Sequence, residues 1–537
     1  MAAKGFAKII IVITTVTAAV MELVDTSIVN VALTDMSGSL GVSIEDISWV
    51  ITAYAIANVI IIPLTGFLSE YFGRKNYYLV SMILFTAASY MCAQSTGLVE
   101  IIVWRFVQGV GGGALLSTSQ AILFDAFEPE DRPFASGLFG MGLVLGPTLG
   151  PTLGGFIIEH MSWPMIFMIN IPIGIVASIL TYTFIDRKPG EGKNKSKIHI
   201  DYIGIALLMA GIGCLQFVLE RGESEDWFSS VAIRICAIIA VVGIAGFIAY
   251  ELRVKNPAVN LRVLGNRNLA FTTVFTFVVG LGLFTSVFVY PVLAQRVLGF
   301  TAYETGLSLL APTLIGVIMM PIIGRSMAKG APTIPLVVLG MTLFAAYSWF
   351  NAKVSPDVGK WAFFFPLALR AFGISMVQLP LINQAVVGLQ PKDYASGIAL
   401  NNMIRQLGGA FGIAMANNFI AHRFAQHRTD LVSNLSEGSI AFTNQTNSIA
   451  QNFVARGGVD ITTATTKAYA LISNTVDRQA YYLAYLDTFR LITFFFIAVI
   501  PLVVFLKTKK QSKHSKEHSV QSKEEKVALK AALAEAH

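Results

Sequence analysis

The chain has 537 residues, of which 54% are apolar and 13% are charged, and its formal net charge is +7. Soluble domains carry about 25% charged residues, so the composition excludes a soluble globular protein and indicates a polytopic helical membrane protein. The three cysteines each lie inside an apolar run, which leaves neither a disulfide framework nor a cysteine metal site and disfavours redox chemistry.

Fourteen apolar runs are each long enough to span a membrane, since a hydrocarbon core about 30 Å thick needs roughly 20 helical residues. No cleavage pattern follows the first run, Ile9 to Leu33, so we expect the N-terminus to be retained. Seventeen Lys and Arg residues lie in the connections of one side and four in the short loops of the other. Basic residues favour the cytoplasmic side, so both termini are predicted to be cytoplasmic, and the net charge needs no nucleic-acid partner.

The two halves of the chain look like weak repeats. The fourth and twelfth runs each carry one arginine, Arg105 and Arg370, and the fifth and thirteenth are rich in glycine. Duplication of a six-helix unit explains this pattern and leaves the seventh and eighth runs as an inserted pair. We therefore predict an N-terminal six-helix bundle over 1–186, an inserted pair with basic cytoplasmic linkers over 187–268, a C-terminal six-helix bundle over 269–506 and a basic cytoplasmic tail over 507–537.

The predicted C-terminal bundle includes a long external segment, 421–485, between the last two runs. The stretches 413–437 and 460–500 contain neither Gly nor Pro, so both flanking spans can continue as helices beyond the bilayer. We expect a protruding helical hairpin. Its apolar residues either pack the two arms together or offer a surface to another protein.

Two carboxylates lie within the first apolar run, where a charged side chain costs about 2.5 to 3.5 kcal/mol. Glu22 and Asp25 are three residues apart and share one face of a helix. Desolvation and mutual repulsion favour proton binding, so we predict that one of them loads and releases a proton, regulated by the charge of Arg105. The alternative is a structural ion pair with Arg105. Arg370 and Arg405 are weaker candidates for the regulating role.

The connection after the second run reads GFLSEYFGRKN, beginning at Gly66. Gly66 and Gly73 permit a tight turn and close helix approach, Glu70 can accept hydrogen bonds from a neighbouring helix end, and Arg74 faces the cytoplasm. This segment resembles the loop after span two of the major facilitator superfamily, with Glu70 where that family usually has Asp. The resemblance implies a gating role for these four residues; the plainer interpretation is a basic cytoplasmic turn.

The fifth run reads GLFGMGLVLGPTLGPTLGG, from Gly137 to Gly155. Its prolines should bend the helix, and its glycines allow a neighbouring helix to lie almost backbone to backbone. The run resembles the antiporter signature of the drug-exporting branch of the superfamily. That resemblance assigns a conformational role to six residues: Gly146, Pro147, Gly150, Pro151, Gly154 and Gly155.

Other motifs extend the resemblance along the chain, among them LVDTSIVNVAL from Leu23, WRFVQGVGGG from Trp104 and NNMIRQLGG from Asn401. Together they identify the chain as similar to the 14-span drug:proton antiporter family of EmrB/QacA type. The resemblance implies a major facilitator fold arranged as six plus two plus six helices, multidrug export from the cytoplasmic (inner) membrane, and protons as the coupling ion with no cofactor. In two-membrane hosts such exporters work with a periplasmic adaptor and an outer-membrane duct.

A substrate cavity between the two bundles is expected to use polar and aromatic side chains of the spans. Taken singly, each is more often a packing or interfacial residue. The candidates are Asn30, Tyr54, Asn58, Gln108, Gln120, Phe284, Phe288, Tyr290, Met376, Gln378, Asn383, Asn401 and Arg405, with Trp49 beside them.

Other functions compete with export. A membrane enzyme is suggested by the acidic segment from Asp125 to Arg132 and is rejected, because no His-rich site or phosphate-binding loop accompanies it. A proton-coupled symporter importing a metabolite, or an exporter of one endogenous lipid or siderophore, would have the same fold. A channel is disfavoured because no filter motif repeats.

Overall fold

The structure is a computed structural model that describes residues 6–187, 200–355, 359–390, 393–433, 435, 439–458 and 460–505. The described residues form helices and contain no strand. The predicted tail over 507–537 and most of the linker after Arg187 lie outside them. The α-helices are α1 (Phe6–Leu40), α2 (Ile44–Ile47), α3 (Trp49–Phe72), α4 (Arg74–Gln94), α5 (Leu98–Ala126), α6 (Arg132–His160), α7 (Met165–Met168), α8 (Asn170–Phe184), α9 (Tyr202–Arg221), α10 (Val231–Glu251), α11 (Arg267–Arg296), α12 (Ala302–Ala328), α13 (Thr333–Asn351), α14 (Phe364–Gln384), α15 (Tyr394–Ser433), α16 (Ile440–Gly457) and α17 (Ile461–Val499).

Twelve helical segments of the described chain are long and apolar enough to cross a membrane. The all-helical membrane prediction is thereby confirmed, whereas the count of fourteen is not. Three helices of 18 or more residues lie outside this set, namely α4, α15 and α16. α15 carries Asn401, Asn402 and Arg405, which are buried against other helices. Because these polar groups face protein, they lower the hydropathy of α15 without facing lipid.

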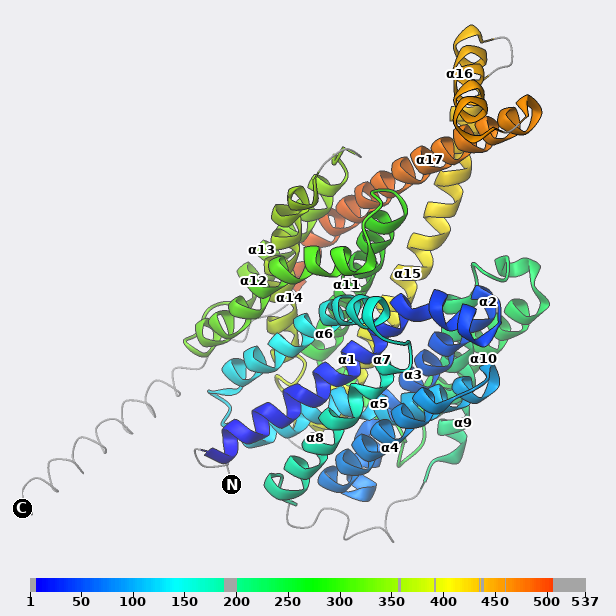
Figure 1. Ribbon diagram of the computed structural model, residues 1–537. Helices are drawn as coiled ribbons and strands as arrows, with labels where there is room; N and C mark the ends of the chain where they lie inside the picture. The colour runs from blue at the N-terminus through cyan, green and yellow to red at the C-terminus, as the bar shows by residue number, and fades with distance from the viewer. Residues whose placement is uncertain are drawn as a thin grey trace, which may run out of the picture.

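The helices before and after the α9–α10 pair meet mainly where α6 packs on α12 and α3 packs on α15; α6 also contacts α14, and α5 contacts α15. α6 also packs along α1, so it lies between α1 and α12, as the cyan helix of Figure 1 does. Buried apolar clusters fill both parts. The larger one joins α11, α13, α14 and α17 around residues such as Phe344, Tyr347 and Phe489.

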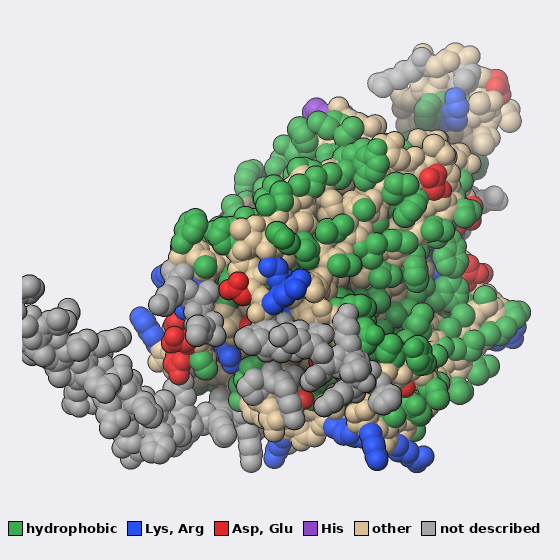
Figure 2. All heavy atoms as spheres, turned by 90° about the horizontal axis from the view of Figure 1, so that it is seen from below, with side chains coloured by type: hydrophobic (Ala, Val, Ile, Leu, Met, Phe, Trp, Pro, Cys, Tyr) green, Lys and Arg blue, Asp and Glu red, His purple; other side chains and the backbone are tan. Residues whose placement is uncertain are grey.

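α9 and α10 pack on each other, and α9 also packs on α3. The outer face of α10 is apolar and uncovered, since Val241 and Val242 keep 70% and 65% of their surface exposed. Figure 1 places this pair at one edge of the bundle. Figure 2 shows apolar side chains covering broad areas of the surface, as expected for a protein in contact with lipid.

α15 and α17 have 40 and 39 residues and project beyond the other helices together with α16 (Figure 1). The predicted helical continuation of both flanking spans is confirmed. α16 packs on α17 through Ala450, Ala464 and Ala468. Asp460 caps α17 by accepting the backbone N–H of Thr463 at 3.0 Å, and hydrogen bonds from Thr463 lower the pKa of Asp460.

An ionic cluster ties α15 to α17 at the base of this projection. The carboxylate of Asp487 on α17 accepts hydrogen bonds from Arg423 Nε at 2.7 Å and Arg490 Nη1 at 2.8 Å. His427 Nε2 lies 2.9 Å from the same carboxylate. Charged partners on both helices therefore hold the two arms together where they leave the bundle.

Candidate functional site

A buried ion pair joins α1 to α5. Asp25 on α1 is fully buried, and its Oδ2 lies 2.6 Å from Nη1 of Arg105 on α5. Arg105 also donates from Nε to the backbone oxygen of Val50 at 3.2 Å. Its guanidinium lies over the ring of Tyr54, 4.2 Å from the centroid. The structure thus brings two of the predicted proton-coupling residues into direct contact.

Three neutral side chains complete this network. Gln108 accepts from Arg105 Nη1 at 2.7 Å and donates to Asp25 Oδ1 at 2.8 Å. Asn170, at the start of α8, donates to the same Oδ1 at 2.8 Å, and Ser89 on α4 accepts from Gln108 at 2.7 Å. Both oxygens of the Asp25 carboxylate therefore have partners. With the bond from Arg105 to Val50 on α3, this ion pair is a junction between five helices, α1, α3, α4, α5 and α8.

Glu22, one helical turn earlier on α1, has a different environment. Its Oε1 accepts a hydrogen bond from Asn58 at 3.1 Å, while its Oε2 is buried without a hydrogen-bond partner. The nearby cationic partner is Arg405 on α15, which interacts with it electrostatically. Glu22 thus connects the two parts of the molecule and retains an oxygen free to bind a proton.

A small internal cavity lies beside Arg405, between α6, α11, α14 and α15. Its volume is about 10 Å³, the space of about one water molecule. Several lining polar atoms have no hydrogen-bond partner: both amide atoms of Gln378, Oδ1 of Asn401 and Oγ1 of Thr276. Unpaired buried polar atoms are costly, so they indicate a site for a polar ligand or water. The lining residues are Leu143, Thr276, Val279, Gln378, Leu381, Ile382, Asn401, Asn402 and Arg405.

Most of the other predicted cavity residues lie elsewhere. Tyr54 and Gln108 belong to the ion-pair network, and Asn58 binds Glu22. Asn30 is exposed. Two amide side chains accept hydrogen bonds from other helices, Gln120 from Asn402 at 3.4 Å and Asn383 from Ser136 at 3.1 Å. The others are packing residues: Met376 beside Met320, Trp49 stacked on Phe217, and Phe284, Phe288 and Tyr290 in the large apolar cluster.

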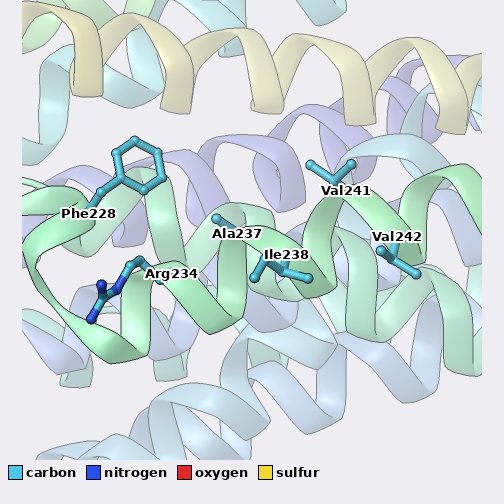
Figure 3. A pocket seen from close by; sticks show the side chains of 6 residues that line it. All are labelled: Phe228, Arg234, Ala237, Ile238, Val241 and Val242. Atoms are coloured by element: carbon cyan, nitrogen blue, oxygen red, sulfur yellow. The ribbon is translucent and has the colours of Figure 1, made fainter.

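A second hollow of about 400 Å³ lies on the uncovered face of α10. Figure 3 shows Arg234 and the aliphatic side chains of the hollow along α10, and Phe228 on the turn that precedes this helix. The hollow opens on the apolar surface of the protein, where acyl chains of membrane lipids fit better than a polar substrate.

The glycines predicted to act in the fifth run face α1 and α12. A Cβ atom on Gly146 would lie 2.5 Å from Leu23 Cβ, and one on Gly150 would overlap Ser27 of α1. Gly154 lies against Ile28 of α1, whereas a Cβ on Gly155 would lie 2.8 Å from the backbone nitrogen of Tyr303 on α12. Pro147 and Pro151 lie within the same helix. The backbone of α6 approaches those of α1 and α12 closely along these glycine seams, because the glycines have no side chains.

The turn after α3 also has close contacts. Gly73 ends α3 with a φ of 81°, a conformation that favours glycine. Gly66 lies against Ser396 of α15, since a Cβ there would come within 2.9 Å of Ser396 Oγ. Arg74 forms an ion pair with Asp125 at the end of α5. Glu70 is exposed on the surface.

Sequence reasoning missed several residues of these contacts. Asn170 could have been found as a polar residue within an apolar run, and Asp125 as the acidic end of the fourth run. Ser89 and Thr276 give no such signal, because their hydroxyls commonly bond to the helix backbone. Among the residues that the structure describes, no group of three or more His, Cys, Asp or Glu side chains could hold a metal ion.

The sequence matches the family model of the Major Facilitator Superfamily over residues 15–413. The chain belongs to the Major Facilitator Superfamily. It is a multi-pass membrane transporter, not an enzyme. The prediction from its motifs is confirmed on this point.

Two bacterial multidrug export proteins are similar to this chain in sequence over most of their length. The multidrug export protein EmrB of Escherichia coli K12 is 32% identical over 434 residues, covering 81% of this chain and 84% of that protein. EmrB of Haemophilus influenzae is 30% identical over 508 residues, covering 94% and 96%. The crystal structure of the human organic anion transporter MFSD10 is 14% identical, with a TM-score of 0.55 and coverage of 91% and 99%, which supports the fold alone.

Proposed function

We propose that this transporter exports amphipathic or lipophilic small molecules in exchange for protons, by alternating access across the cytoplasmic (inner) membrane. The environment of Glu22 is the observation on which this proposal rests. This carboxylate is buried, has one unpartnered oxygen and interacts with Arg405, which lines the internal cavity. A proton site and a candidate substrate site therefore share one arginine.

The charge of Arg405 determines whether proton binding at Glu22 favours or opposes substrate binding. The cavity has space for about one water molecule in this structure, so the proposal requires that it widens in another state of the transport cycle. When Glu22 is charged, it compensates Arg405, and the widened cavity accepts a neutral or cationic amphipathic molecule. When Glu22 is protonated, Arg405 carries an uncompensated positive charge beside the cavity, which disfavours lipophilic cations. Proton and substrate then oppose one another's binding, as antiport requires.

Asp25 has a different part in this proposal. Its carboxylate is held by Arg105, Gln108 and Asn170, so proton binding there would break a satisfied network. We assign it, with Arg105, to holding α1 in register and to regulating the charge near Glu22. The glycine seams of α6 against α1 and α12 supply surfaces along which the two bundles can rock.

Fourteen spans and cytoplasmic termini belong to the same proposal. α4 packs on α5 and α8, and α15 packs on α11 and α17, all of which contain segments apolar enough to cross the membrane. Counting both helices as spans gives the even number that places both termini on one side. The excess of Lys and Arg in the connections of that side supports its cytoplasmic location.

Replacing Glu22 with glutamine should abolish the pH dependence of transport, with a loss of about tenfold or more in the rate driven by a pH gradient. The amide removes the titratable group and leaves Arg405 uncompensated. Sealed proteoliposomes with an imposed pH gradient measure the rate for a lipophilic cationic dye. The double variant Glu22→Gln with Arg405→Gln should regain dye binding without regaining coupling.

Asp35→Asn is the control, because Asp35 lies on the same helix and is exposed. It should leave coupling unchanged. Full pH-driven exchange in Glu22→Gln would remove the proposed role of Glu22. The same proteoliposomes test the exchange itself, because movement of protons and dye in the same direction would instead indicate a symporter.

A periplasmic adaptor protein, leading to an outer-membrane duct, is the partner we propose for the α15–α17 projection. Ile440, Ile461 and Leu471 keep 78%, 60% and 47% of their surface exposed there. Apolar side chains exposed on a water-facing projection favour protein binding.

Changing these three residues together to serine should abolish co-purification of the adaptor. It should leave the proteoliposome rate unchanged, since the projection lies away from the internal cavity. Val99→Ser, which alters an apolar residue that is 74% exposed at the start of α5, is the control. Undiminished adaptor binding by the triple variant would contradict the partner assignment.

A further inference from the structure

Arg370 on α14 is buried to all but 4% of its surface. Its Nε and Nη1 atoms are buried without any hydrogen-bond acceptor. In the part of the chain that the structure describes, no Asp or Glu forms an ion pair with it. An arginine cannot discard its charge by losing a proton, so this positive charge is desolvated and uncompensated.

The three other described arginines buried at comparable depth differ in this respect, and one of them, Arg221, lies 3.4 Å from a carboxylate oxygen of Glu225. Arg105 contacts the carboxylate of Asp25, and Arg405 interacts with Glu22. Arg370 lies in the twelfth apolar run as Arg105 lies in the fourth, but among the described residues no carboxylate contacts Arg370. The charge balance of the C-terminal bundle is therefore incomplete without an anion.

The surroundings of Arg370 are aromatic and hydroxylic. Tyr347 on α13 lies with its ring centroid 6.0 Å from the guanidinium carbon, and its hydroxyl is buried without a partner. Tyr290 on α11 also interacts electrostatically with Arg370, and its hydroxyl is paired with Ser308 at 2.7 Å. A cation–π contact offsets part of the desolvation of an arginine, but it supplies no acceptor for the N–H groups.

We propose that Arg370 and the hydroxyl of Tyr347 bind a compact anion of single charge, a halide or a carboxylate. The guanidinium N–H groups and the phenolic O–H are all hydrogen-bond donors, and an anion accepts from each of them. The tight apolar packing around Tyr347, where Phe344 and Phe489 lie with ring centroids 5.4 and 6.0 Å away, favours a small ligand. This site is separate from the proton exchange at Glu22.

Binding is tested on the purified full-length protein in detergent, without any transport assay. The unfolding temperature is measured while sodium sulfate, whose anion is doubly charged, is replaced at constant ionic strength by sodium chloride and, separately, by sodium acetate. We expect a saturable rise of about 2 to 5 °C for a ligand well above its dissociation constant. A response to chloride identifies an inorganic anion, and a response to acetate alone identifies an organic carboxylate.

Arg370→Gln should lose the response, whereas Arg234→Gln should keep it. Arg234 is the matched control because it is an exposed arginine on the outer face of α10. Tyr347→Phe removes only the hydroxyl and should weaken the affinity about fivefold, which tests the site even when Arg370→Gln fails to fold. An equal response in the wild type and both site variants, or no response of the wild type to either anion, would overturn the proposal.

Discussion

Asp25→Asn is expected to lower the free energy of unfolding by about 3 to 5 kcal/mol and to abolish pH-driven export. In the native protein, Nη1 of Arg105 lies 2.6 Å from Oδ2 of Asp25. The substitution leaves this arginine buried without its anionic partner, and the uncompensated buried charge lowers the stability. Gln108 and Asn170 also lose a charged acceptor. Chemical denaturation in detergent and efflux from proteoliposomes measure the two effects separately.

The double variant Asp25→Asn with Arg105→Gln separates structure from coupling. Removing both charges eliminates the uncompensated arginine, so most of the lost stability should return. Export should stay impaired if this pair regulates the charge near Glu22. A double variant that regains stability and also exports normally would leave the pair with a purely structural role. Wild-type stability in Asp25→Asn alone would contradict the buried network itself.

Gly150→Leu is expected to abolish transport and to destabilise the protein by about 1 to 3 kcal/mol. A Cβ atom at this position would overlap the Ser27 side chain and lie 2.9 Å from the backbone nitrogen of Ile28. Relief of that clash must push α6 away from α1, the helix that carries Glu22 and Asp25. Transport rate and the amount of folded protein in the membrane are the measurements.

Gly150→Ala and Gly38→Ala form a matched pair for this test. Gly38 lies in α1, and a Cβ atom there would have no neighbour within 4 Å, so alanine at this position should be neutral or stabilising by about 0.4 to 1 kcal/mol. Gly150→Ala should already reduce transport. Equal, unimpaired transport in both alanine variants would show that the close approach of α6 and α1 is dispensable.

Sequence patterns predicted the features that depend on local periodicity. The apolar runs indicated the spanning helices, and the absence of Gly and Pro predicted that α15 and α17 continue beyond the bundle. The spacing of glycines in α6 predicted close helix approach, because a missing side chain has the same consequence wherever the partner helix lies. The three-residue spacing of Glu22 and Asp25 placed both on one helix face.

Contacts between distant segments were harder to predict. Nothing in the sequence distinguishes Asp25, whose partners are Arg105, Gln108 and Asn170, from Glu22, which binds Asn58. The order of helices around the cavity depends on tertiary packing, so Tyr290 and Met376 were expected at the cavity but pack in apolar clusters. Hydropathy likewise undervalues α15, whose polar face is covered by protein.

The lengths of α15 and α17 have a mechanical consequence. At 1.5 Å per residue each helix is about 60 Å long, roughly twice the thickness of the hydrocarbon core. Two such rods, bridged by the Asp487 cluster, behave as one lever whose inner arm carries Arg405. A rocking motion of about 10° would swing a point some 30 Å outside the membrane by about 5 Å. Each transport cycle would therefore move a protein bound to the outer end of the two helices. A mechanical load on that end would in turn slow the transport cycle.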